Sequence, residues 1–277
     1  MANSINTNYG ASIALQNLNT TNAQLQTTQN RINTGQKVSS AKDNGAIFAI
    51  ATSQRASMGA QDAVKNSLQR GQSIIDVALA AGDTAVSALQ EMKALAVNIA
   101  SSSGDAQAAY LADWNALGKE VDSALKGASF DGVNLWNGTT ATNVTTSTAS
   151  TGNTYQIGFG TTDKAAATAI TDITATAAAP TDAATTAAFA TKVDAAIKAM
   201  TTDMATLGTQ SKSVGRTINF VGKLQDALES GIGNLVDADL AKESAKLTAL
   251  QTKQQLGVQA LSIANQGSSI LLSLFRN

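Results

Sequence analysis

The chain has 277 residues, and its 19 basic and 20 acidic residues give a net charge of −1 at pH 7. This balance argues against a nucleic-acid surface, which would need a strongly basic face. The sequence contains neither histidine nor cysteine, so the commonest general base, the commonest zinc ligands and thiolate nucleophiles are missing, and we expect no enzyme activity, no catalytic residue, no cofactor and no metal.

The N-terminal segment is free of charge. Met1 to Asn30 contains no acidic or basic side chain, and burying an unpaired charge is costly. We therefore expect a helix over residues 1–33 whose contacts become dry in an assembly, and an ordinary helix pair within one chain is the alternative. One set of positions recurs in alternating steps of four and three, the coiled-coil spacing: Ala11, Leu15, Leu18, Asn22, Leu25, Gln29 and Ile32.

The same segment bears on export and on membranes. It lacks the basic start and continuous apolar stretch of a cleaved secretion signal, because its first basic residue is Arg31. No uninterrupted apolar run in the chain reaches the ~20 residues of a membrane-spanning helix. We expect no membrane contact and, if the protein is secreted, export without a cleaved signal.

A connector follows over residues 34–45. Gly35 and Gly45 interrupt the helical pattern there, with serine and asparagine between them. We expect both glycines to act as hinges.

Helical rods are expected over residues 46–129. Small residues on the first rod would allow close approach of another helix, and a break at Ser101 to Gly104 should let a shorter second helix fold back antiparallel. The first rod keeps the four-three spacing at Val64, Leu68, Gly71, Ile75, Ala78, Gly82, Ala85, Leu89, Met92, Ala96 and Ile99. The second helix has its stripe at Tyr110, Trp114, Leu117, Val121, Ala124 and Ala128.

A β-rich insertion is expected over residues 130–185. Two glycine turns between Phe130 and Gly138 end the helical pattern, and Tyr155 to Phe159 alternates apolar and polar residues as a half-buried strand does. The rest of the insertion is a low-complexity mixture of alanine and threonine. We expect a β-hairpin with variable loops.

A further rod is expected over residues 186–232. Its apolar stripe runs from Val193 to Ile232, and after Gly231 and Gly233 it restarts one residue out of phase at Val236. This phase slip predicts a break in the helix, with both glycines as hinges.

The closing helix is expected over residues 235–277. Asp237 and Asp239 precede it; two carboxylates at a helix start could be metal ligands but are far more often caps and dipole partners. No charged residue lies between Lys253 and Arg276, so the last turns have no solvated charged side. Such a helix needs partners on several sides.

These patterns predict a mainly α fold of long antiparallel helical rods and coiled coil, with a small β-rich insertion and with paired N- and C-terminal helices. A low aromatic content of 4% and a single proline, Pro180, agree with long helices packed side by side.

Four segments of the chain together resemble the bacterial flagellins, of the short alphaproteobacterial kind. The opening segments Ser4 to Asn8 and Ala14 to Leu18 are similar to the start of that family, and Arg31 to Ala51 is similar to its R-x-[NS]-[ST]-G…S-A-[KR]-D signature. Phe130-Asp131-Gly132-Val133 resembles its F-[ND]-G-V turn, and Asp237 to Arg276 resembles its closing D-A-D-x-A-x-E-[ST]-A…A-N-Q…L-L-x-L-[FL]-R pattern.

The resemblance implies a structural subunit that is exported unfolded through the flagellar type III channel and polymerises into the extracellular filament used for swimming. The implied partners are other copies of the chain, alone or mixed with paralogous flagellins, the flagellar cap and hook–filament junction proteins, and an export chaperone on the C-terminal helix. A hook–filament junction protein, or another secreted helical structural protein, is the alternative. No nucleic acid or membrane is implied.

In this family the two terminal helices form the filament core, which agrees with the charge-free ends. We therefore predict a polymerisation interface made of the apolar side chains of both ends. Its residues are Leu15, Leu18, Leu25, Ile32, Leu240, Leu247, Leu250, Leu256, Leu261, Ile263, Ile270, Leu271, Leu274 and Phe275.

Overall fold

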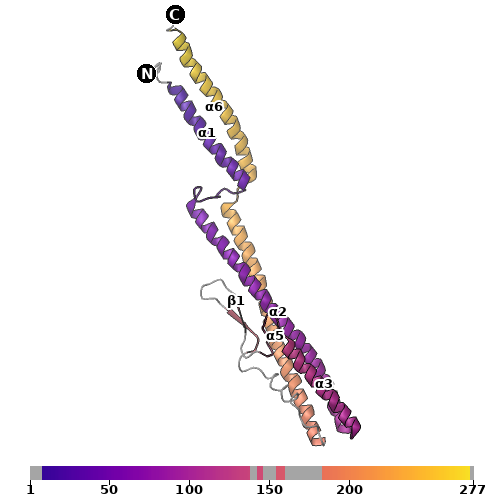
Figure 1. The fold of residues 1–277 in the computed structure, drawn as a ribbon. Helices are drawn as coiled ribbons and strands as arrows, with labels where there is room; N and C mark the ends of the chain where they lie inside the picture. The colour runs from indigo at the N-terminus through magenta and orange to yellow at the C-terminus, as the bar shows by residue number, and fades with distance from the viewer. Residues whose placement is uncertain (1–7, 138–141, 146–153, 160–182, 275–277) are drawn as a thin grey trace. The chain divides into compact units, whose positions relative to one another are not determined.

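The structure is a computed structural model that describes residues 8–137, 142–145, 154–159 and 183–274. Five long helices and a two-stranded sheet make up the described fold (Figure 1). In chain order these elements are α1 (Tyr9–Thr34), α2 (Gly45–Ser101), α3 (Asp105–Gly127), β1 (Thr142–Thr145), β2 (Thr154–Ile157), α5 (Ala183–Val236) and α6 (Leu240–Leu274). The mainly α fold with paired terminal helices is therefore confirmed.

The chain divides into two compact units, which are described separately. Unit 1 contains residues 1–56 and 227–277, and unit 2 contains residues 57–226. The divisions fall inside α2 and α5. The first turns of α2 and the last turns of α5 belong to unit 1, and the remaining length of both helices belongs to unit 2.

Unit 1 is built on the antiparallel pair α1–α6, whose outer ends are the two chain ends (Figure 1). At one end the Asn8 side-chain amide donates to the Ala264 carbonyl at 2.8 Å, and at the other Arg31 meets Glu243. Unit 1 also contains a small apolar cluster, in which Ala51 of α2 packs with Ile232 and Val236 of α5.

Side chains and one glycine fix the ends of the terminal helices. Asn8 caps α1 by accepting from the Ala11 N–H at 3.0 Å, and α1 ends at Gly35, whose φ of +69° favours a residue without a β-carbon. Asp239 caps α6 by accepting from the N–H groups of Ala241 and Lys242, both at 3.1 Å. The capping role predicted for Asp239 is confirmed.

Unit 2 is a bundle of α2, α3 and α5. All eleven predicted stripe positions of α2, from Val64 to Ile99, are buried, and α3 lies alongside α2 (Figure 1). The helix α5 runs antiparallel to α2, because Lys93 pairs with Asp194 at 2.6 Å and Gln225 donates to Asp62 at 2.7 Å. The α5 residues that complete this core are Val193, Met200, Leu207, Val214 and Val221.

The hairpin β1–β2 packs on α2. The strands are antiparallel, with Val144 opposite Tyr155, and the side chains of Val144 and Ile157 are buried. A β-carbon at Gly71 would lie 2.7 Å from Val144 Cγ2, so this glycine provides the close approach expected for the first rod. The neighbour that approaches is a strand, where the sequence suggested a helix.

A tryptophan clamp holds the segment before the hairpin. The Trp136 indole N–H donates to the Ala78 carbonyl in the middle of α2 at 2.8 Å, and its ring lies 5.1 Å from that of Phe159. A β-carbon at Gly82 would stand 3.0 Å from Met204 and 3.1 Å from Trp136. Small residues on α2 thus admit aromatic and methionine side chains to the core.

The break predicted at Gly231 and Gly233 is wrong in position. The helix α5 continues through both residues and ends at Val236, because single glycines cost a helix only about 1 kcal/mol each. A β-carbon at Gly233 would lie 2.8 Å from the Asp237 carboxylate, and the Asp237 N–H donates to the Gly233 carbonyl. Gly233 therefore serves the end of the helix, and the non-helical residues are 237–239.

Across the described residues, no helix has the length and apolar character needed to cross a membrane. Nor does this part of the chain bring together three or more side chains of the types that hold a metal ion.

Candidate assembly surface

The contact between α1 and α6 follows a heptad stripe on each helix. On α1 the stripe has Thr21 and Thr28 buried, at 3% and 0% exposure. Its positions, all buried or half-buried, are Ala11, Ala14, Leu18, Thr21, Leu25, Thr28 and Ile32. On α6 they are Glu243, Leu247, Leu250, Gln254, Gly257, Leu261 and Ala264.

Within the single chain, every second position of the predicted α1 stripe lies in the contact with α6, and the positions between lie outside it. Leu15, Asn22 and Gln29, the positions between, are exposed in the single chain, with Leu15 at 49%, so their contact in an assembly stays a prediction. Ala11, Leu18, Leu25 and Ile32 are seven residues apart. The four-three spacing can therefore be completed by two sets of positions between them, either Leu15, Asn22 and Gln29 or Ala14, Thr21 and Thr28. The structure uses the smaller Ala14 and threonine set, which lets the helices come close.

Close approach is visible at Gly257 of α6. A β-carbon there would lie 3.3 Å from Leu18 Cδ1, which is tight for two apolar atoms. Leu250 is 6% exposed and is the one fully buried leucine among the described α6 side chains. The pair is thus held by leucines over small residues, with Asn22 and Gln254 joined by a side-chain hydrogen bond of 2.8 Å at its edge.

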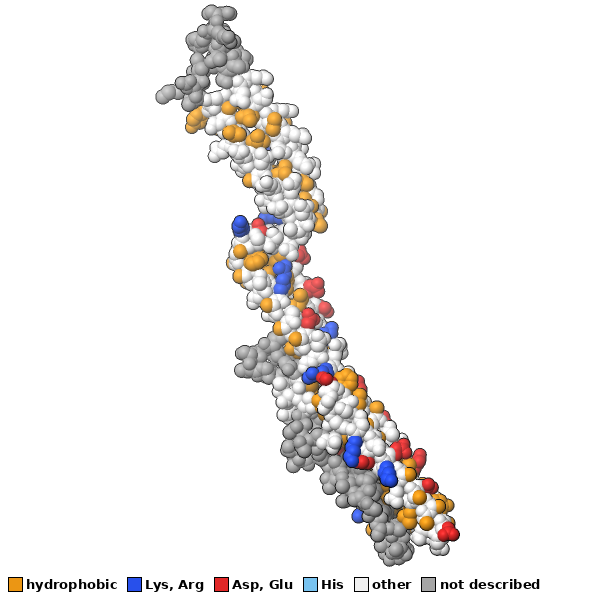
Figure 2. Space-filling model, viewed as in Figure 1, with side chains coloured by type: hydrophobic (Ala, Val, Ile, Leu, Met, Phe, Trp, Pro, Cys, Tyr) orange, Lys and Arg blue, Asp and Glu red, His pale blue; other side chains and the backbone are white. Residues whose placement is uncertain are grey.

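A second set of apolar side chains on the same pair is about half exposed or more. Leu256 is 59% and Ile263 70% exposed on α6. On α1, Ile13 is 50% and Leu15 49% exposed, and because they are two residues apart they lie on different faces of the helix. Figure 2 shows apolar side chains spread over the visible face of this helix pair. We use the name outer apolar row for these four residues, which are exposed outside the contact stripes of the two helices.

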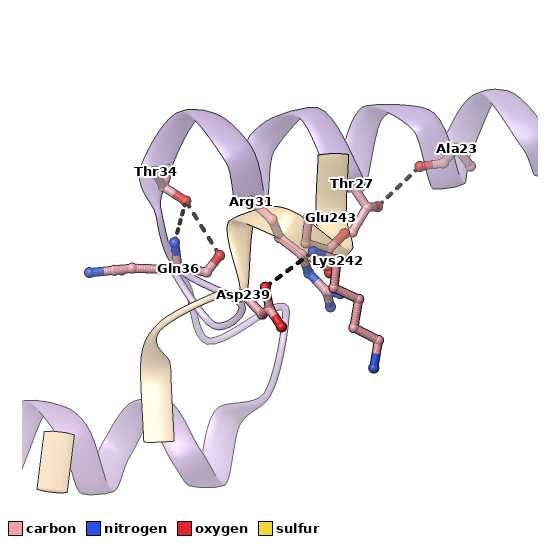
Figure 3. A network of polar contacts seen from close by, with 8 residues as sticks. All are labelled: Ala23, Thr27, Arg31, Thr34, Gln36, Asp239, Lys242 and Glu243. Carbon is pink, nitrogen blue, oxygen red and sulfur yellow. Dashed lines mark hydrogen bonds and ion pairs between the residues drawn. The ribbon is translucent and has the colours of Figure 1, made fainter. Parts of the chain in front are cut away.

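The charged groups of the described pair lie in the half nearest the connector: Arg31 on α1, and Lys242, Glu243, Lys246 and Lys253 on α6. Arg31 Nη1 donates to Glu243 Oε1 at 3.1 Å, where the side chains are 31% and 12% exposed (Figure 3). The Arg31 Nε and Glu243 Oε2 atoms are buried without a hydrogen-bond partner in the structure. Breaking such a partly buried pair leaves an uncompensated charge, so this pair favours one register of α1 against α6.

The connector between α1 and α2 is held by one carboxylate. Asp43 Oδ2 accepts from the backbone N–H and the hydroxyl groups of both Ser39 and Ser40, at 3.0–3.1 Å. These hydrogen bonds hold the pKa of the Asp43 carboxyl below its usual range. The largest contribution comes from the Ser40 N–H, followed by the Ser39 N–H and the two hydroxyls. Gly35 ends α1 and Gly45 begins α2, so both predicted hinges lie at helix ends.

The predicted interface residues fall into three groups. Leu18, Leu25, Ile32, Leu247, Leu250 and Leu261 lie in the contact between α1 and α6. Leu15, Leu240, Leu256 and Ile263 are exposed. The side chains of Ile270, Leu271 and Leu274 lie outside what the structure describes, although their backbone is part of α6, and Phe275 lies beyond the described residues.

Comparison with known proteins matches both ends of the chain. Residues 5–141 match the bacterial flagellin N-terminal helical region, and residues 190–275 match the bacterial flagellin C-terminal helical region. The chain is 52% identical to flagellin FljM of Caulobacter vibrioides, 39% identical to a flagellin of Brucella melitensis and 34% identical to flagellin C of Rhizobium meliloti. Each alignment covers 99% of this chain and 99% of the relative.

Proposed function

Because the chain belongs to the bacterial flagellin family, we propose that it polymerises through its terminal helix pair into the flagellar filament. It is a structural subunit of that filament. Membership of this family fits a sequence without histidine or cysteine, because a filament subunit must bind copies of itself and needs no reactive side chain.

The outer apolar row is the observation that carries the proposed mode of polymerisation. Leu256 and Ile263 on α6, and Leu15 and Ile13 on α1, are all about half exposed or more. Removing each from water is worth about 1 kcal/mol, and a monomer gains nothing from leaving them exposed. Contact with other copies is the simplest way to bury them.

The charge pattern of the two helices supports the same conclusion. No charged side chain precedes Arg31, and none lies between Lys253 and Arg276. Dehydrating a charge would cost several kcal/mol unless it were paired. The segments that carry the outer apolar row can therefore be surrounded by other copies without burying a single side-chain charge.

Export and the remaining partners follow from family membership as proposals. We propose that the chain leaves the cell unfolded through the flagellar type III channel, meets an export chaperone on α6 in the cytoplasm, and is added to the extracellular filament under the cap protein. The absence of cysteine from the sequence is compatible with passage as an unfolded chain, because no disulfide has to form or be broken.

Seeded growth is the test. Purified chain is added to short filament fragments and followed by electron microscopy, with a truncated chain that lacks Leu256 to Asn277 as the comparison. Long filaments from the full chain alone are expected. A hook–filament junction protein would add a single layer and stop. Filaments from both chains would show that polymerisation does not need Leu256 to Asn277, and would contradict the role of Leu256 and Ile263 in it.

A further inference from the structure

The outward face of α5 in unit 2 carries cations on both sides of an exposed aromatic ring. Arg216 and Lys223 are exposed and seven residues apart, which is two helical turns or about 10 Å. Phe220 lies between them and is 64% exposed. Neither cation takes part in an ion pair among the described residues. We call Arg216, Phe220 and Lys223 the basic stripe.

The outward face of α3 in the same unit has the opposite charge and the same spacing. Asp113 and Glu120 are exposed and also seven residues apart, with the exposed Ala116 between them. The ion pairs among the described residues do not include either carboxylate. The opposite side of α3 is committed to the core through the buried Trp114 and Val121. We call Asp113, Ala116 and Glu120 the acidic stripe.

We propose that the basic stripe of one copy docks against the acidic stripe of a second copy in the filament. This inference rests on the proposed function and names two surfaces through which the copies meet. The charges are complementary, the spacings are equal, and the small Ala116 leaves room for the Phe220 ring. Because the two stripes are different surfaces, the contact is head-to-tail, the type of contact that builds a helical filament when the rotation between copies does not close into a ring.

The directions of the helices fit this contact. Within unit 2, α3 and α5 both run antiparallel to α2, so they run parallel to each other. In a polar filament all copies point the same way, and α3 of one copy therefore meets α5 of the next in parallel. In that orientation Arg216 stands opposite Asp113 and Lys223 opposite Glu120.

The contact should depend on salt. Exposed ion pairs are individually weak and are screened over about 10 Å at 0.1 M salt, but every copy makes this contact once with each stripe. Reversing one stripe replaces attraction by repulsion at both positions. We expect such a reversal to raise the critical concentration for polymerisation by about tenfold at low salt, and by less at high salt.

Charge exchange tests the proposal on the full chain. One variant carries Arg216→Glu and Lys223→Glu, a second carries Asp113→Lys and Glu120→Lys, and a third carries all four substitutions. Each single-stripe variant should polymerise poorly, and a mixture of the two should lose much of that defect. The third variant should polymerise with itself but grow slowly on wild-type seeds, because like charges then meet at the contact.

A control with the same change of charge separates this contact from a general charge effect. Asp83 and Glu91 are exposed on α2, and Asp83→Lys with Glu91→Lys adds the same charge as reversal of the acidic stripe. This control should change the critical concentration by less than about twofold. Equal behaviour of the control and the acidic-stripe variant would overturn the proposal.

A cross-link gives a second readout that does not depend on charge. The chain has no cysteine, so Ala116→Cys and Phe220→Cys in one chain supply the only thiols. Oxidation of filaments should link neighbouring copies into a ladder of oligomers, whereas Ala116→Cys alone should not. The contact would be refuted if the wild-type chain forms filaments, all charge variants grow normally and oxidation gives no ladder. If the wild-type chain itself fails to polymerise, the proposed function is refuted instead.

Discussion

Gly71→Ala tests how the β-hairpin is seated on α2. The glycine is buried, and a β-carbon at its position would lie 2.7 Å from Val144 Cγ2 and 3.3 Å from Val144 Cγ1. Apolar carbon atoms pack at about 3.5–4.0 Å. The added methyl group must therefore displace Val144, which is 3% exposed in the core.

Two effects of opposite sign decide the outcome. Alanine stabilises a helix interior by about 1 kcal/mol relative to glycine, and overpacking a core costs about 1–3 kcal/mol. Gly59→Ala in the same helix isolates the first effect, because nothing lies within 4 Å of a β-carbon there. The free energies of unfolding of the two variants should therefore differ by the overpacking cost alone, with Gly59→Ala the more stable.

Thermal unfolding of the monomer measures this difference. For a unit of this size about 1 kcal/mol corresponds to 2–4 °C, so Gly59→Ala should melt about 2–12 °C above Gly71→Ala. Combining Gly71→Ala with Val144→Ala should remove most of the overpacking cost and show favourable coupling in a double-mutant cycle. Equal stabilisation by the two single alanine variants would show that the hairpin does not pack on Gly71.

Three further predictions concern unit 1. Leu256→Ala with Ile263→Ala should leave the melting of the monomer almost unchanged. It should raise the critical concentration for polymerisation by about thirtyfold, since two apolar contacts of about 1 kcal/mol each are lost. Gln255→Ala, an exposed change on the same helix, should have little effect, and a similar effect of both changes would contradict the role of the outer apolar row. Leu250→Ala should cost about 2–4 kcal/mol in the α1–α6 pair, detected as faster amide exchange in α1, and unchanged exchange would refute the packing. Because the pKa of Asp43 is lowered, its carboxylate stabilises the connector fully at neutral pH, and this stabilisation is lost as pH falls below about 4 through the folded-state pKa. Protease cleavage of the connector should accelerate on that acidification. Asp43→Asn should abolish the difference in cleavage rate between neutral and acid pH.

The sequence predicted the helical core better than the helix ends. The α2 stripe from Val64 to Ile99 was right at every position because each member is apolar or small and one face of a long helix must be buried. On α1 the spacing predicted only every second contact with α6, because positions seven residues apart are compatible with two different sets of residues between them. Hydrophobicity favoured Leu15 for the remainder, but the close approach of α6 favoured the smaller Thr21 and Thr28.

The helix break was misplaced for a related reason. Gly231 and Gly233 suggested a break by residue type, yet a helix tolerates single glycines at a cost of about 1 kcal/mol each. The contact that ends α5 involves the Asp237 side chain folded close to Gly233, and no pattern of residue types reveals that geometry. The basic and acidic stripes were likewise missed, because charged side chains on outward helix faces are usual and become informative only when the structure shows their spacing.

The accessibility of Ile263 in monomer and filament tests the account most directly. Because the wild-type chain contains no cysteine, Ile263→Cys provides a single thiol at a position that is 70% exposed in the monomer. Maleimide labelling should be rapid in the monomer and at least about tenfold slower in intact filaments, since the outer apolar row is then buried between copies. Labelling at the same rate in both states would mean that the terminal helix pair stays exposed to water and that the filament is held together elsewhere.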